Sequence, residues 1–234
     1  MLPTRLLIVL VCASFCRAQP AAPSPASPPK VLLLVRQRFK SAKARARERL
    51  ERATVAIYNR LEVPVYWMEL QAFTGLPEAL FFHPYDSFEA VEKAGTVLGP
   101  LYEMHPELLR MQAGIDDALA SQRNILAVRL DSPGIDTINL AQARFLRMLV
   151  VGAGPGQQPP ALPNAIVYRV NSGMPGPAFL IFQALTAFAD IPPISLTSGT
   201  ILEDSIYAIE PEMSHVSRAF AEQDRSFWMK PPGQ

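Results

Sequence analysis

Residues 65–82 read VYWMELQAFTGLPEALFF, and residues 166–182 read IVYRVNSGMPGPAFLIF. Each stretch has two runs rich in aromatic and β-branched residues, joined by a turn with glycine and proline, which is the pattern of a β-hairpin. The two turns align as Thr74-Gly75-Leu76-Pro77 against Ser172-Gly173-Met174-Pro175. The same hairpin therefore occurs twice in the chain, and this predicts an internal duplication.

The segments around the first hairpin predict a β-α-β-β-α-β order, which is that of a ferredoxin-like unit. Continuous apolar runs indicate buried strands, whereas apolar residues at intervals of three to four indicate helices. Asp86 resembles a helix cap, and Pro106 suits the first turn of a helix. We expect the first repeat over residues 31–135, with strands near 31–35 and 123–130 and helices near 41–61, 86–99 and from 106 onward.

The second repeat, expected over residues 140–228, looks degenerate. Residues 143–151 predict its first strand, but the Gly/Pro-rich segment 152–163 excludes a helix before the second hairpin. A helix beginning at Thr186 is cut short by Pro192-Pro193, and a last helix is expected over residues 200–216. The missing helix would leave part of an apolar sheet face uncovered. Two readings stay open: a partner subunit in a homodimer covers it, or this copy has degenerated.

Side chains alternate across a strand, so each predicted sheet has two distinguishable faces. One face is apolar throughout and is expected to lie under the helices. The other mixes aromatic, acidic and basic residues and is expected to line the interior of a barrel formed by the two repeats. Its polar and aromatic members are the candidate ligand-binding residues Trp67, Glu69, His83, Tyr85, Arg129, Arg147, Arg169 and Gln183.

Two interpretations of this mixed face stay open. In the first, Glu69 pairs with one arginine, the other arginines reach the rim, and nothing binds, because buried charges need partners or water. In the second, the face lines a cavity for a small anionic or aromatic ligand, with guanidinium groups as donors. His83 is a structural histidine in the first interpretation and a haem ligand or general base in the second. No metal site is expected, and no cofactor is required.

The duplicated unit with a polar inter-sheet face resembles the dimeric α+β barrel superfamily, which includes NIPSNAP-like and antibiotic-biosynthesis-monooxygenase-like proteins. Four segments resemble, more closely, secreted bacterial proteins of unknown function with that fold: residues 75–79, 88–94, 121–123 and 211–217. The resemblance implies the barrel fold. It does not select a function, because the superfamily hosts cofactor-free oxygenases, haem-binding enzymes and binding proteins.

The N-terminus predicts export. Arg5 precedes an apolar run over residues 6–15, and Ala18 ends a segment suited to signal-peptide cleavage before Gln19. Cleavage would remove both cysteines and two arginines, leaving 20 basic against 21 acidic residues and a net charge of −1. Residues 19–30 would follow as a Pro/Ala/Ser linker. We therefore expect a secreted or periplasmic protein without disulfides, without a membrane-spanning segment after cleavage, and without a bias toward nucleic acid.

These observations support three hypotheses for function. The first is a secreted protein that binds a small molecule in a barrel cavity. The second is a monooxygenase-like enzyme, cofactor-free or haem-dependent, that uses the same cavity. The third is a structural or interaction protein that oligomerises through residues 145–183. A dinucleotide site at the glycines of residues 152–156 is rejected, because the prolines that follow forbid the helix such a site requires.

Overall fold

The computed structural model describes residues 28–131, 138–154, 156–158, 162, 164–194 and 199–229. The predicted signal peptide and most of the predicted linker lie outside the described residues.

The first half has the order predicted from the sequence. Strand β1 is followed by helix α1, the hairpin β2–β3, two consecutive helices and strand β4. The bounds are β1 Val31–Phe39, α1 Ala44–Arg60, β2 Met68–Ala72, β3 Glu78–Tyr85, α2 Phe88–Met104, α3 Pro106–Ala118 and β4 Leu119–Leu130. The cap of α2 is Ser87, whose side chain accepts a hydrogen bond from the Ala90 amide, in place of the expected Asp86.

Among the described residues, the second half consists mainly of strands. Its strands are β5 Phe145–Gly152, β6 Ala165–Ser172, β7 Ala178–Leu185 and β8 Thr200–Ile209. The helix expected from Thr186 is a single 3₁₀ turn, Phe188–Asp190. The helix expected over residues 200–216 is wrong, because β8 fills most of that range. Tyr207 and Ile209 are buried at the spacing of two that a strand requires.

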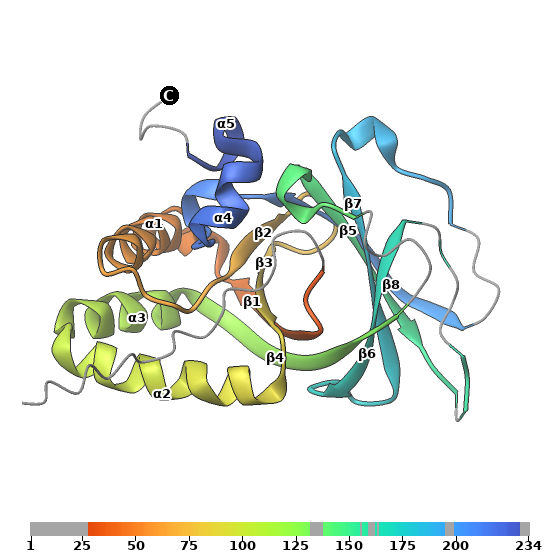
Figure 1. Ribbon diagram of the computed structural model, residues 1–234, viewed down its shortest axis with the longest axis horizontal. Coiled ribbons are helices and arrows are strands. Elements are labelled where there is room, and N and C mark those ends of the chain that lie inside the picture. The colour runs from red at the N-terminus through yellow and green to blue at the C-terminus, as the bar shows by residue number, and fades with distance from the viewer. Residues whose placement is uncertain are drawn as a thin grey trace, which may run out of the picture.

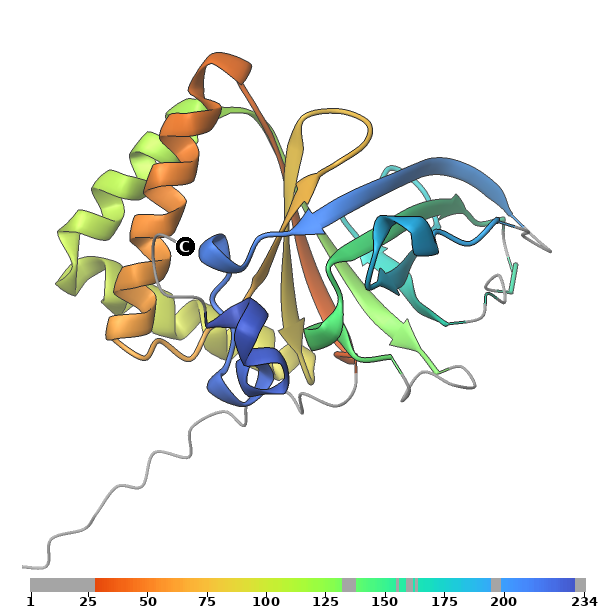
Figure 2. The same ribbon diagram turned by 90° about the horizontal axis from the view of Figure 1, so that it is seen from above.

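Two short helices end the described chain. They are α4 Arg218–Ala221 and α5 Arg225–Trp228. Figure 2 shows them beside the end of α1 at which the chain leaves toward β2. No helix among the described residues is long and apolar enough to cross a membrane.

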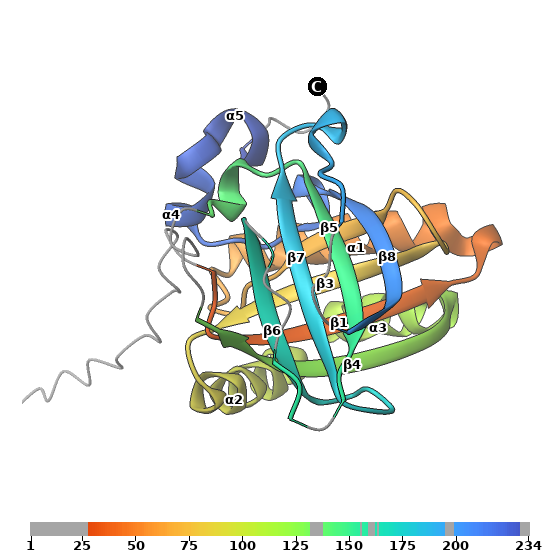
Figure 3. The ribbon, with the colours of Figure 1, turned by 90° about the vertical axis from the view of Figure 1, so that its right-hand side faces the viewer.

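The eight strands form one closed barrel in the order β1-β3-β2-β8-β5-β7-β6-β4. Within each half the order is fourth, first, third, second strand, so both halves have the ferredoxin-like arrangement. The halves join through the antiparallel pairs β2–β8 and β4–β6. The prediction of a duplicated α+β barrel with a degenerate second copy is confirmed. Figures 1 and 3 show helices α1, α2 and α3 against the first half only.

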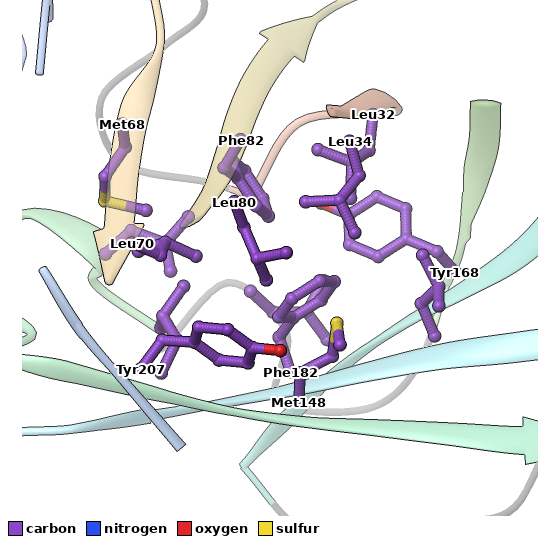
Figure 4. Close-up of a cluster of buried hydrophobic side chains, with 14 of the residues drawn as sticks. Leu32, Leu34, Met68, Leu70, Leu80, Phe82, Met148, Tyr168, Phe182 and Tyr207 are labelled. Atoms are coloured by element: carbon purple, nitrogen blue, oxygen red, sulfur yellow. The ribbon is translucent and has the colours of Figure 1, made fainter. Parts of the chain in front are cut away.

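The barrel interior is the main hydrophobic core. All eight strands contribute buried residues to it, among them Leu34, Leu70, Met148, Phe182 and Tyr207. Figure 4 shows these side chains meeting from opposite walls. The apolar face therefore lines the interior, and the expectation that it lies under the helices is wrong. An eight-stranded barrel is just wide enough for side chains to fill, so the face turned inward is the one that can pack without water.

The outer faces of the two halves are covered in different ways. Outside the first half, Trp67, Phe81 and Ala79 pack beneath the helices with residues such as Tyr58 and Leu108. Outside the second half, three strands contribute a smaller cluster that packs against the end of β4 and against loop residues. Its members are Leu149, Val151, Ala165, Val167, Phe179 and Ile181, with Leu130, Ala153, Leu162 and Ile194 against them. The chain's own loops thus bury much of the face that the sequence suggested was uncovered.

Candidate functional site

The structure divides the predicted site residues between separate locations outside the barrel core. Trp67 and Tyr85 pack in the cluster beneath the helices. Glu69 is completely buried there and accepts a hydrogen bond of 2.8 Å from the guanidinium of Arg47 on α1. The expectation of an arginine partner for Glu69 is thus met, but the arginine comes from helix α1 and not from the mixed face of the sheet.

His83 lies next to the rings of Trp67 and Phe81, with centroid distances of 6.1 and 6.4 Å. Burial lowers the pKa of His83 to about 4, so the imidazole is neutral at physiological pH. Its Nδ1 atom is buried and has no hydrogen-bond partner among the described residues. No three His, Cys, Asp or Glu side chains gather as a metal site would need in the part of the chain described.

Of the remaining candidates, three lie on the outer wall of the second half, and Arg129 lies near the end of β4. Arg147 binds Asp204 through Nε and Nη2 at 2.8 and 2.7 Å, and Gln183 stands opposite Arg147 in the β5–β7 register. Arg169 is exposed on β6. Arg129 donates to the carbonyl oxygen of Pro28. None of the eight predicted residues lines either of the two cavities described below, so their ligand-binding role stays a prediction from sequence.

A polar network missed by the sequence analysis lies inside the barrel at one end. Arg36 of β1 donates to both carboxylate oxygens of Glu203 at 2.8 and 2.9 Å and to Glu78 at 2.6 Å. The Tyr207 hydroxyl donates to the same Glu78 oxygen at 2.5 Å. Burial, and then the bond to Glu78, raises the pKa of Tyr207, so the phenol keeps its proton. These four polar groups form a hydrogen-bonded layer at one end of the apolar interior.

Above this network is a cavity of about 240 Å³, which we call the barrel-mouth cavity. Two further arginines line it. Arg38 lies 3.7 Å from Glu78, with about half of its side chain exposed, and the Arg123 guanidinium donates a hydrogen bond of 3.9 Å to the Met174 sulfur. The full lining is Arg36, Arg38, Glu78, Ser121, Gln122, Arg123, Val150, Met174, Leu202 and Glu203. Three guanidinium groups face two carboxylates, so the lining carries a formal charge of +1.

A signal for this network was present in the sequence. Arg36 continues the alternation of the buried Leu32 and Leu34, and Glu78 precedes Leu80 by two residues. Each of these charged residues therefore lies on the same face of its strand as the apolar core residues, near the end of the strand. Such positions lie inside the barrel but close enough to its opening for charged groups to reach one another and water.

Comparison with known proteins finds similar structures but no similar sequence. No model of a sequence family matches the chain, and no curated protein matches it in sequence. An anthrone oxidase-like protein matches at 13% identity and a TM-score of 0.49, over 77% of this chain and 91% of that one. A proposed monooxygenase of Lactobacillus acidophilus matches at 7% and 0.45, over 77% and 92%. A proposed chlorite dismutase matches at 10% and 0.44, over 82% and 96%.

The assignment of this chain to a closed α+β barrel of two ferredoxin-like halves rests on its own strand order. At such low identities the activities in the names of the matched proteins are not transferred to this chain.

Proposed function

We propose that this protein binds a small organic anion, a carboxylate with a short apolar body, in the barrel-mouth cavity. The observation that carries the proposal is the pair of guanidinium groups of Arg38 and Arg123, which line the cavity. Arg123 has no carboxylate partner among the described residues, and Arg38 forms only a long ion pair of 3.7 Å with Glu78. Guanidinium groups bind carboxylates through paired hydrogen bonds, and a partly enclosed site strengthens such contacts.

The buried network holds the floor of this cavity in place. Arg36 already donates hydrogen bonds to Glu78 and Glu203, so we assign the binding of the ligand to Arg38 and Arg123 instead. Because those bonds join β1, β3 and β8, they fix the strands whose ends form the cavity wall. Val150 and Met174 supply apolar wall for the body of the ligand, and the cavity volume of about 240 Å³ admits only a small molecule.

The proposal is tested by calorimetric titration of the purified protein with benzoate and hexanoate, with benzamide and hexanamide as uncharged counterparts. We expect the carboxylates to bind and the amides to bind at least about tenfold more weakly, since a charge-assisted pair contributes about 1.5–3 kcal/mol. Arg123→Gln is expected to weaken binding by a similar factor. Arg49→Gln, on the exposed surface of α1, is the matched control and should leave binding unchanged.

Two results would overturn the proposal. One is equal binding of carboxylate and amide, which would mean that charge does not select the ligand. The other is unchanged carboxylate affinity in Arg123→Gln and Arg38→Gln, which would place the binding site elsewhere on the protein.

A further inference from the structure

A second cavity, of about 440 Å³, lies between the end of α1 and the C-terminal segment. We call it the C-terminal cavity. Its lining comes from the loop after α1, from the approach to β2, and from the two short helices α4 and α5, which Figure 2 shows beside α1. Polar and aromatic side chains in this lining include Asn59, Glu62, Tyr66, Arg218 and Trp228.

His215 lines this cavity, and several contacts hold its ring in place. Its Nε2 donates to the Val63 carbonyl oxygen at 2.8 Å, and its Nδ1 lies 2.7 Å from the Asn59 side-chain amide. The ring stacks on Tyr66 with a centroid distance of 5.3 Å, and its backbone bridges to Trp67. Because both ring nitrogens are engaged, His215 holds Tyr66 in place and is not itself available to a ligand. The cavity thus has a preformed aromatic wall.

Glu62 occupies a position at which glycine is the usual residue. Its φ is +50°, and it follows α1 with two closing hydrogen bonds, Glu62 N–H to Asn59 O at 3.3 Å and Val63 N–H to Tyr58 O at 3.1 Å. This is the geometry of a Schellman ending, which favours glycine at the left-handed position. The Glu62 carboxylate forms no hydrogen bond or ion pair with another described residue.

Arg218 supplies the opposite charge to the same cavity. Its Nε binds Glu222 at 2.9 Å on the exposed surface, and its other two guanidinium nitrogens have no bond of this kind among the described residues. Glu62 and Arg218 both line the cavity, yet they form no ion pair with each other. A carboxylate and a guanidinium at separate points of one cavity leave room for a molecule that bridges them.

We propose that the C-terminal cavity binds a zwitterionic small molecule of the α-amino acid type with an aromatic or branched apolar side chain. Its ammonium group pairs with Glu62 and its carboxylate with Arg218. Its side chain packs against Tyr66 and Trp228. The strained conformation of Glu62 supports this role, since residues held in costly backbone conformations concentrate at sites of function. The proposal is independent of the anion site at the barrel mouth.

The test uses L-phenylalanine as the probe, titrated calorimetrically into the full chain carrying Arg123→Gln, so that carboxylate binding at the barrel mouth is suppressed. Phenethylamine, which lacks the carboxylate, and 3-phenylpropionate, which lacks the ammonium group, are the comparison ligands. We expect L-phenylalanine to bind, and each singly charged analogue to bind at least about tenfold more weakly. Glu62→Gln and Arg218→Gln should each reduce the affinity for L-phenylalanine by a similar factor.

Glu62→Gly separates the functional role from a structural one. Glycine adopts the left-handed conformation without steric cost, so this variant should raise the melting temperature while it loses binding. Glu103→Gln, a substitution of an exposed glutamate on α2, is the control that should change neither property. Absence of L-phenylalanine binding at millimolar concentration, or unchanged affinity in both Glu62 variants, would overturn the proposal.

Discussion

The ion pair of Arg47 with Glu69 is the most deeply buried charged contact described in the protein. Arg47 is 1% exposed and Glu69 is fully buried. Arg47 Nη2 donates to Glu69 at 2.8 Å, and the carboxylate of Glu51 lies 3.7 Å away. The guanidinium carbon also lies 5.6 Å from the centroid of the Phe81 ring. One guanidinium therefore compensates two carboxylates between α1 and the sheet.

We predict that Arg47→Met destabilises the fold severely. The substitution keeps an unbranched side chain of helical propensity but leaves Glu69 and Glu51 buried without a positive charge. Breaking a buried pair by removing one partner costs about 3–5 kcal/mol, which is a large share of the roughly 5–15 kcal/mol that stabilises a typical domain. Adding Glu69→Gln to Arg47→Met should recover part of the loss, because it removes one of the stranded charges.

The measurement is the free energy of unfolding from urea titration at pH 7, followed by circular dichroism. Arg52→Met is the matched control, because Arg52 lies on the same helix and pairs with Glu212 at 2.8 Å while both side chains are about half exposed. An exposed pair contributes about 0–1 kcal/mol. If Arg47→Met and Arg52→Met lose the same stability, burial does not set the strength of these pairs and the reasoning fails.

Three further predictions follow from local features. Burial lowers the pKa of His83 to about 4, so between pH 6.5 and about 4 the unfolded chain binds a proton that the folded chain does not. Stability should therefore fall as pH falls through this window, by about 1.4 kcal/mol per unit for one proton; a His83→Gln variant with the same pH slope in urea unfolding would contradict this. Gly173→Ala should cost more than Gly75→Ala, since both positions have positive φ but only at Gly173 would a Cβ lie 2.0 Å from a backbone oxygen of β4. Left-handed strain costs about 1–2 kcal/mol in both and overpacking about 1–3 kcal/mol more, and equal urea midpoints would refute the comparison. Intact-mass analysis of exported protein should give a chain that begins at Gln19, and an uncleaved N-terminus would exclude the predicted signal peptide.

The duplicated hairpins made the fold predictable from sequence. Both carry a glycine with positive φ, Gly75 at +85° and Gly173 at +92°, in turns flanked by alternating apolar residues. Turn chemistry of this kind is local and can be recognised in a single sequence. Strand β8 was not recognised, because Ile201, Ser205 and Ala208 also fit the spacing of a helix. Its pairing with β2 and β5, rather than its own periodicity, fixes it as a strand.

The inside of the barrel could not be told from its outside by hydrophobicity, since the first half buries both faces of its strands. Leu80 lies in the barrel core while its neighbours Ala79 and Phe81 lie beneath the helices, and all three are buried. The inner and outer faces of these strands differ in whether a polar side chain there can find a partner or water. A closed barrel of eight strands has no gaps along its length through which a charge can find a partner or water.

The layer between sheet and helices admits such a partner, because a long side chain from α1 can enter it. Arg47 does so and meets Glu69. Charged side chains that point into the barrel instead lie at the strand ends, where Arg36 donates a hydrogen bond to Glu203. The site at the barrel mouth therefore follows from a general condition: in a filled barrel, ionised side chains of the inward face can persist only at an opening. Charged residues that interrupt the apolar alternation near strand ends are thus the positions at which to look for ligand contacts in this fold.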